Sequence, residues 1–158
     1  MTIRSDDEKM RAEWTIPSGV FVVTLRSGER VNAYAAGWVV RVSEVPVIIQ
    51  AAVWEENYSF QLAADCDVFA VQVLGADQVE VARHFGRTSG RDIDKLEGYD
   101  VEPGESGIPI LTDCVSFLEC EVISRPMFGD HIVLVGRVTN SRVNRDAPGL
   151  VYRHEDYQ

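Results

Sequence analysis

Two strand-like runs near the C-terminal end place the strongest constraint on how this chain folds. In Phe117–Val122, three apolar residues alternate with Glu119 and Glu121, and this period of two is typical of a half-buried strand. A turn at Met127–Asp130 leads into His131–Val138, a continuous apolar run that is typical of a strand buried on both faces. The pattern therefore predicts two neighbouring strands joined by a short turn.

Four earlier runs have the β-branched and aromatic composition of strands and are bounded by turn residues. They are Val20–Leu25, Arg30–Val40, Pro46–Trp54 and Asp67–Leu74, with a hairpin turn at Arg26–Glu29 between the first two. Strands at such short spacing predict a mainly β, mostly antiparallel sheet that closes into a barrel, because closure removes exposed strand edges.

A few short helices are expected, one before the first strand at Ser5–Trp14 and two between strands at Asn57–Ala64 and Asp77–Phe85. The first begins with the capping-box spacing of Ser5 and Glu8, and the third begins with the same spacing and Asp77 as the cap. The second can be capped by Asn57 or Ser59. These helices are too short to dominate the fold.

The organisation of the chain indicates one domain over residues 1–158. This length is typical of a single domain, and an apolar content of 46% is enough for a core. Residues 86–110 are rich in Gly and charge and predict a long loop with one helical turn. Repeats, low-complexity tracts and linkers are absent from the sequence.

The charge balance excludes several classes of partner. With 15 Lys and Arg against 25 Asp and Glu, the formal net charge is −10, which disfavours nucleic acid and anionic membrane surfaces as partners. No apolar stretch is long enough to span a bilayer, and the acidic start lacks the apolar core of a signal peptide.

The cysteines indicate a reducing compartment. Cys114 and Cys120 lie six residues apart in an extended-looking run, about 20 Å apart on a strand, whereas a disulfide needs Cα atoms within about 7 Å. Cys66 brings the count to three, an odd number. Free thiols in the core or at the surface are expected, and with no secretion signal they predict a cytoplasmic protein.

Familiar catalytic motifs are missing. The sequence has no glycine-rich dinucleotide fingerprint, no P-loop and no nucleophile elbow. The three histidines are far apart, and no Cys-x-x-Cys pair is present, so no metal site is expected.

An ordered set of short motifs carries more information than any one of them. In chain order they are Gly19–Thr24, Asn32-Ala33, Trp38, Val42-Ser43-x-x-Pro46, Asn57-Tyr58-Ser59, Phe69–Val71, Phe85-Gly86-x-x-Ser89-Gly90-Arg91-Asp92-x-Asp94-Lys95, Gly107-x-Pro109-x-Leu111, Leu118–Glu121, Gly129-Asp130-His131 and Leu150-Val151-Tyr152. The set resembles the flavin reductase-like family, and the segment from Phe85 to Lys95 is similar to its flavoredoxin and high-molecular-weight rubredoxin branch.

The resemblance implies a six-stranded antiparallel split β-barrel that forms a homodimer, with FMN (FAD being the alternative) near the subunit interface. NAD(P)H would be the co-substrate, its nicotinamide stacking on the flavin. The cofactor-binding residues implied are Asn32, Ala33, Tyr34, Ala35, Ala36, Ser43, Asn57, Tyr58, Ser59, Ser89 and Arg91, and His131 is implied as the catalytic residue.

The phosphate of the cofactor is expected at Asn57-Tyr58-Ser59, because the start of a helix offers unpaired N–H groups to an anion. Either Arg91 or Lys95 could supply the compensating charge. The alternatives are that Asn57 or Ser59 only caps the helix, and that Arg91 pairs with a neighbouring aspartate.

Small residues between Asn32 and Gly37 would let the flavin ring approach the backbone closely. Tyr34-Ala35 stands where relatives often carry Thr or Ser. This difference changes the polar contacts that can be expected with the flavin more than it changes the expected fold. We expect Trp38 to fill the core, with stacking at the site as the alternative.

His131 is expected where nicotinamide would stack, to position substrate or to stabilise the charge of reduced flavin. A histidine that only opens its strand, bonded to backbone, is the alternative. The sequence thus predicts an NAD(P)H-dependent flavin oxidoreductase that passes electrons to an acceptor or a partner monooxygenase. The alternatives are a non-enzymatic FMN electron carrier and a dimeric barrel without cofactor.

Overall fold

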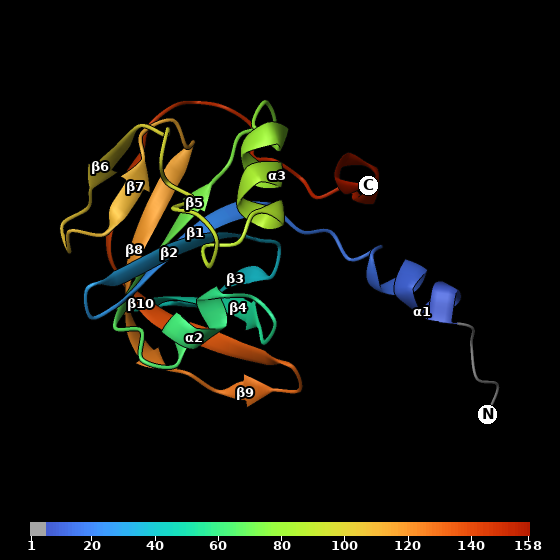
Figure 1. The fold of residues 1–158 in the computed structure, drawn as a ribbon, viewed down its shortest axis with the longest axis horizontal. Coiled ribbons are helices and arrows are strands. Elements are labelled where there is room, and N and C mark those ends of the chain that lie inside the picture. The colour runs from blue at the N-terminus through green and yellow to red at the C-terminus, as the bar shows by residue number, and fades with distance from the viewer. Residues whose placement is uncertain (1–5) are drawn as a thin grey trace.

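The computed structural model describes residues 6–158 (Figure 1), and an antiparallel sheet forms its main element. The strands of this sheet are β1 (Phe21–Ser27), β2 (Arg30–Ala36), β3 (Val39–Glu44), β4 (Val47–Trp54), β5 (Val68–Val73), β8 (Ser116–Ser124), β9 (Met127–Phe128) and β10 (His131–Val143). They pair in the order β2-β1-β5-β8-β10-β4-β3, and β9 is added beside β10.

The sheet curls into a barrel with one opening along its side. β2 ends the pairing order at one edge, and it lies against β4 without forming a ladder with it. The interior is filled by alternate residues of the strands, such as Val23 and Leu25 of β1, together with Leu62 of α2 (Ser59–Ala63). The mainly β, antiparallel split barrel is therefore confirmed.

A second apolar layer covers part of the outside of the barrel. Val22 of β1 faces this layer and meets Phe85 of α3 (Val79–Arg87) and Ile108. The layer is completed by a separate hairpin of β6 (Val101–Pro103) and β7 (Pro109–Leu111). β1 is thus buried on both faces, as its continuous apolar sequence requires.

The six runs predicted as strands correspond to β1, β2, β4, β5, β8 and β10. The prediction of one strand over Arg30–Val40 was wrong, because the chain leaves β2 after Ala36 and starts β3 at Val39. β10 runs to Val143, five residues past the apolar run, since its polar end pairs with β8. The predicted loop at 86–110 starts within the last two residues of α3 and contains β6 and most of β7. The expected helical turn is present, because the Ile93 N–H donates to the Ser89 carbonyl at 3.2 Å.

The start of one helix differs from its prediction, and one predicted cap lies outside the described residues. α1 (Asp6–Glu13) projects away from the barrel (Figure 1), and Ser5 of its predicted capping box lies outside the described residues. Asp77 does not cap α3, because its carboxylate accepts hydrogen bonds from the Arg145 guanidinium at 2.9 and 3.2 Å. The N-cap of α2 is Tyr58, and Asn57, one residue earlier, accepts the Ser59 N–H at 2.9 Å. No helix within residues 6–158 combines the length and apolarity needed to cross a membrane.

The three cysteines are free and buried, as expected. Burial raises the pKa of Cys66 and Cys114 to about 11 and that of Cys120 to about 12. The thiols therefore stay protonated at neutral pH and act as apolar side chains rather than nucleophiles.

Glu119 forms the main buried polar contact of the outer layer. Its carboxylate accepts hydrogen bonds from the backbone N–H of Glu105 and Ser106, the Ser106 hydroxyl and the Asn140 amide, at 2.6–3.1 Å. Burial raises the pKa of this carboxyl, but the four hydrogen bonds outweigh burial and hold it below its ordinary value. The charged side chain thereby fixes the tip of the β6–β7 hairpin onto β8.

Replacing Glu119 with Gln should lower the free energy of unfolding by about 1–3 kcal/mol, because an amide cannot accept from all four donors. Because the folded-state pKa is depressed, this stabilisation is present at neutral pH and is lost as the pH falls through the glutamate range. Chemical denaturation at pH 7 and pH 3.5 measures both effects. Glu121→Gln, on the exposed side of the same strand, is the matched control, and equal losses in the two variants would contradict this role.

Candidate functional site

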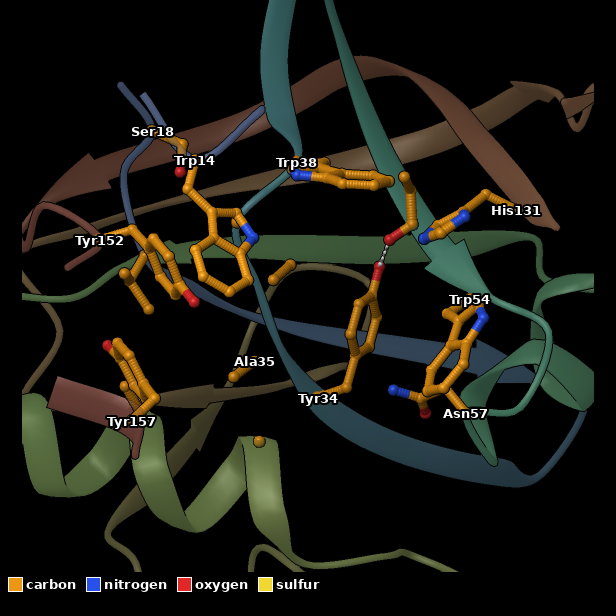
Figure 2. A pocket seen from close by; sticks show the side chains of 16 residues that line it. Trp14, Ser18, Tyr34, Ala35, Trp38, Trp54, Asn57, His131, Tyr152 and Tyr157 are labelled. Atoms are coloured by element: carbon orange, nitrogen blue, oxygen red, sulfur yellow. Dashed lines mark hydrogen bonds between the residues drawn. The ribbon is translucent and has the colours of Figure 1, made fainter. Parts of the chain in front are cut away.

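A cavity of about 440 Å³ lies at the open side of the barrel, beside the end of β2 (Figure 2). Aromatic rings from distant parts of the chain form its walls, and small residues form much of its floor. We call it the aromatic pocket, and its aromatic lining consists of Trp14, Tyr34, Trp38, Trp54, His131, Tyr152 and Tyr157.

One wall of the aromatic pocket comes from the two terminal segments. The ring of Trp14 stacks on His154 with centroids 3.7 Å apart, and Tyr152 stacks on Tyr157 at 5.2 Å with nearly parallel planes. Tyr157 and His154 belong to η1 (His154–Tyr157). The hydroxyl oxygen of Tyr157 is buried without a hydrogen-bond partner, so this wall holds a polar group that its own chain leaves unsatisfied.

His131 and Trp38 form the opposite wall (Figure 2). His131 opens β10 opposite Trp54, and the Asp130 carboxylate accepts a hydrogen bond from its Nδ1 at 2.7 Å. This bond holds the pKa of Asp130 below its ordinary value. His131 is therefore bonded to a carboxylate, not to backbone as the alternative proposed.

The Trp38 ring lies 4.6 Å from the His131 ring, and 67% of the residue is exposed. The expectation that Trp38 fills the core was wrong. The break between β2 and β3 places it on the rim of the aromatic pocket instead.

The floor is built by β2, which is one of the two edge strands of the sheet. The Tyr34 hydroxyl donates to the carbonyl of Ala52 at 3.1 Å and so ties the floor to β4. Ala35 packs against Gly86 of α3, where an added Cβ would make an ordinary contact with the alanine methyl. Because an edge strand directs every second N–H and C=O away from the sheet, β2 offers unpaired backbone groups along this opening.

Asn32, Asn57 and Ser59 form a polar cluster next to the floor. The Asn32 amide donates to the Ser59 hydroxyl at 2.8 Å, and both side chains are buried. A Cβ at Gly90 would lie 2.1 Å from the Asn32 carboxamide oxygen, so only glycine fits there. Of the three residues, Asn57 lines the aromatic pocket, while Ser59 faces inward and anchors Asn32.

Two arginines gather at Tyr58, next to this cluster. The guanidinium of Arg91 lies 5.6 Å from the Tyr58 ring centroid, and Arg30 donates to the Tyr58 hydroxyl at 3.4 Å. No ion pair joins Arg91 to Asp92 or Asp94, all three of which are among the described residues. Arg30 was missed from the sequence, although it lies on β2 two residues before Asn32, on the same face of the strand.

Lys95 takes a different position from Arg91. Its ammonium group is buried and donates to the Phe85 carbonyl at 2.6 Å, near the end of α3. Burial lowers the pKa of Lys95 to about 8. Lys95 thus satisfies a helix carbonyl, and of the two cations predicted for the phosphate, Arg91 is the one that faces solvent near Tyr58, next to Arg30.

Of the other predicted residues, Ala36 lines the aromatic pocket, and Ala33, Ser43 and Ser89 lie around it. Ala33 is buried in the outer layer, and Ser43 pairs with Ile48 at the bulged end of β3, away from the pocket lining. The Ser89 hydroxyl accepts the Arg91 N–H at 3.1 Å and shapes the loop that carries this arginine. Within residues 6–158, no group of three metal-ligating side chains forms a metal site.

The chain is thus a split barrel with an aromatic pocket beside an open edge strand. The family model described as "Flavin reductase like domain" matches residues 10–158, and the chain belongs to this family. The resemblance found in the sequence is confirmed.

Known relatives agree with this assignment. The chain is 31% identical to the diflavin flavoprotein A 1 of Synechocystis over 94% of its own length, but it spans only 26% of that protein. It is 25% identical to the high molecular weight rubredoxin of Moorella thermoacetica, over 91% of this chain and 64% of the relative. The structure of an NADH:FAD oxidoreductase from Streptomyces globisporus superposes with a TM-score of 0.84 at 25% identity, covering 96% and 92% of the two chains.

Proposed function

We propose that this chain is an FMN- or FAD-binding oxidoreductase that takes electrons from NAD(P)H and passes them to an acceptor or a partner monooxygenase. The observation that carries the proposal is the open edge of β2 along the floor of the aromatic pocket. A flavin ring needs hydrogen-bonding partners along one edge and flat apolar surfaces on its faces. The unpaired backbone of β2 and the aromatic walls supply both.

The cationic pair at Tyr58 supports a phosphate site at the other end of the same ligand. Asn57 adjoins the aromatic pocket, and the next residue, Tyr58, gathers Arg30 and Arg91. Two guanidinium groups offset the carboxylates of Glu55 and Glu56, which lie exposed just before this turn. In the bound state, Arg91 and Arg30 would hold the phosphate, while the Asn32–Ser59 contact keeps the floor in place.

The flavin would supply hydride acceptance, and the protein would supply orientation. His131 and Trp38 form a wall against which a nicotinamide ring can stack. With Asp130 fixing Nδ1, the Nε2 atom of His131 is left to donate or accept a hydrogen bond at the open side of the pocket. Positioning of this kind, rather than proton transfer, is the role we assign to His131.

An electron carrier without NAD(P)H activity is the second candidate. The match to high molecular weight rubredoxin favours it, and so does the match to a diflavin flavoprotein of which this chain spans about a quarter. For both candidates we propose that the protein works in the reducing cytosol. The three free thiols support this compartment.

A homodimer is part of the proposal. Large apolar side chains are exposed on β3, at the end of β4 and on β9, and we call them the apolar strip: Val40, Val42, Trp54, Met127 and Phe128. Monomeric proteins seldom expose such a set together, least of all along an edge strand. Because Trp54 also lines the aromatic pocket, a second copy on the strip would shield the pocket from solvent.

Flavin binding tests the proposal directly. Purified protein titrated with FMN and FAD should bind at least one of them, with a shift of the visible absorption bands. Arg91→Gln should weaken that binding about tenfold or more, because a charge-assisted hydrogen bond contributes about 1.5–3 kcal/mol. Arg137→Gln, an exposed arginine on β10, is the control. Absence of binding to both flavins would overturn the flavin function and leave a barrel without cofactor.

Mixing the flavin-loaded protein with NADH or NADPH separates a reductase from a carrier. A reductase should bleach the flavin absorption in stopped-flow experiments, and His131→Ala, measured on protein saturated with flavin, should slow this step about tenfold or more. A flavin that stays oxidised with both coenzymes would reject the reductase and favour the carrier.

The dimer is tested by placing charge on the apolar strip. Val42→Glu and Phe128→Glu should each shift the protein from dimer to monomer in sedimentation velocity, because a buried unpaired carboxylate is costly. Val143→Glu, which alters an equally apolar side chain that is 74% exposed, should leave the dimer intact. Wild-type protein that sediments as a monomer would disprove this part of the proposal.

A further inference from the structure

A cleft of about 460 Å³ lies on the outside of the barrel, between the start of α3 and the β6–β7 hairpin. Its size falls within the range of about 300–1,000 Å³ that is usual for small-molecule sites. It shares no lining residue with the aromatic pocket and has no role in the function proposed above. We call it the hairpin cleft, and its polar lining consists of Gln78, Tyr99, Asp100, Thr112 and Asp113.

Two carboxylates of the hairpin cleft have no cationic partner of their own. Asp100 and Asp113 are exposed, and neither belongs to an ion pair among residues 6–158. The Arg145 guanidinium gives its hydrogen bonds to Asp77, which raises the pKa of Arg145 more than Asp113 does. The start of α3 adds a partial positive charge of about half a unit, which two carboxylates outweigh. The cleft therefore favours a cation.

Hydrogen bonds from neighbouring segments fix the backbone that carries both carboxylates. The Thr112 N–H donates to the Asp100 carbonyl at 3.1 Å, which brings Asp113, the next residue, close to Asp100. The Gln78 side chain, on a residue that is only 5% exposed, accepts the Gly75 N–H at 2.8 Å and donates to the Asp113 carbonyl at 3.0 Å and to its carboxylate at 3.3 Å. A carboxylate has about four acceptor positions, so both aspartates keep positions for a ligand in a cleft that is already formed.

Apolar and aromatic surface adjoins the carboxylates. Val81 of α3 and Leu111 of β7 line the hairpin cleft together with Tyr99. The Tyr99 ring packs against Phe85 and His84, with centroids 5.1 and 5.0 Å apart, and burial raises its pKa, so its hydroxyl stays neutral at pH 7. An inorganic cation would use the carboxylates and leave this apolar surface uncovered. An organic cation with an apolar body uses both.

We propose that the hairpin cleft binds a small organic cation, whose charged group lies at Asp100 and Asp113 and whose apolar body covers Val81, Tyr99 and Leu111. A planar amidinium or guanidinium group suits the site best, because its parallel N–H groups can donate to both oxygens of a carboxylate. This inference goes beyond the proposed function and does not rest on it, since the hairpin cleft and the aromatic pocket are lined by different residues.

Benzamidine is the probe for this site, because it carries an amidinium group on a flat apolar ring. Benzamide has nearly the same shape without the charge, and benzoate reverses the charge. In titrations of the full chain labelled with ¹⁵N, benzamidine should shift the amide resonances of Thr112 and Asp113 in a saturable way. Benzamide and benzoate should bind at least about fivefold more weakly, because only the cation offsets the two carboxylates.

Removing either charge should weaken the binding of benzamidine. Asp100→Asn and Asp113→Asn should each raise its Kd about threefold, which is the usual size of the effect for a solvent-exposed charge pair. Both aspartates are exposed, so these changes should leave the fold intact. Asp65→Asn, at an exposed aspartate outside the hairpin cleft, is the matched control and should leave the Kd unchanged. Added salt should weaken the wild-type interaction, because it screens exposed charges.

Three outcomes would overturn the proposal: no saturable shift at Thr112 and Asp113, equal affinity for benzamidine and benzamide, or equal affinity of Asp100→Asn, Asp113→Asn and the wild type for benzamidine. Shifts confined to the lining of the aromatic pocket amount to the first of these. Failure of the flavin function is recognised separately, by the absence of flavin binding, because the benzamidine titration contains no flavin and is read at residues of the hairpin cleft.

Discussion

The open edge of β2 is the constraint on which the arrangement of this protein depends. A closed barrel would pair every backbone group with another strand, whereas here β2 packs against β4 without a ladder and keeps half of its N–H and C=O groups free. Edges of this kind are hazardous when they face solvent, because they invite pairing with other chains. In this chain the edge lies along a pocket walled by aromatic rings, so a planar, hydrogen-bonding ligand can take the place of the missing strand.

Buried polar contacts hold the surroundings of that edge in position. Asn32 is locked between Ser59 and Gly90 on one side of the site, and Lys95 fixes the loop that carries Arg91 on the other. Glu119 does the same for the β6–β7 hairpin. In each case a buried polar side chain has a hydrogen-bond partner on another segment of the chain, and hydrogen bonding of this kind lets buried polar groups help to specify one structure. A preformed site lowers the ordering cost of binding.

Local patterns were sufficient wherever the apolar sequence and the final environment agreed. The six predicted strands formed because their alternating or continuous apolar runs match one or two buried faces. The Asn57 side chain bonds the first N–H of α2 because this contact involves only neighbouring residues. Predictions failed where a distant partner competed with a local one. The Asp77 carboxylate bonds Arg145 instead of capping α3, and the polar end of β10 forms a strand because it pairs with β8. Nothing in the sequence near Trp14 or Tyr157 indicates that they form one wall of a pocket. The segments that carry them come together only in the folded chain.

The amino-acid sequence by itself determined the antiparallel barrel, its family and the segments that surround the site, because periodicity and short motifs depend on residues close together in the chain. Tertiary structure alone decided which side chains face one another. It turned Trp38 outward onto His131, buried Lys95 and left Arg91 exposed, and placed Arg30 beside Tyr58. These outcomes follow from packing between elements that are distant in sequence. The spacing of residues along the chain does not indicate which distant elements pack together.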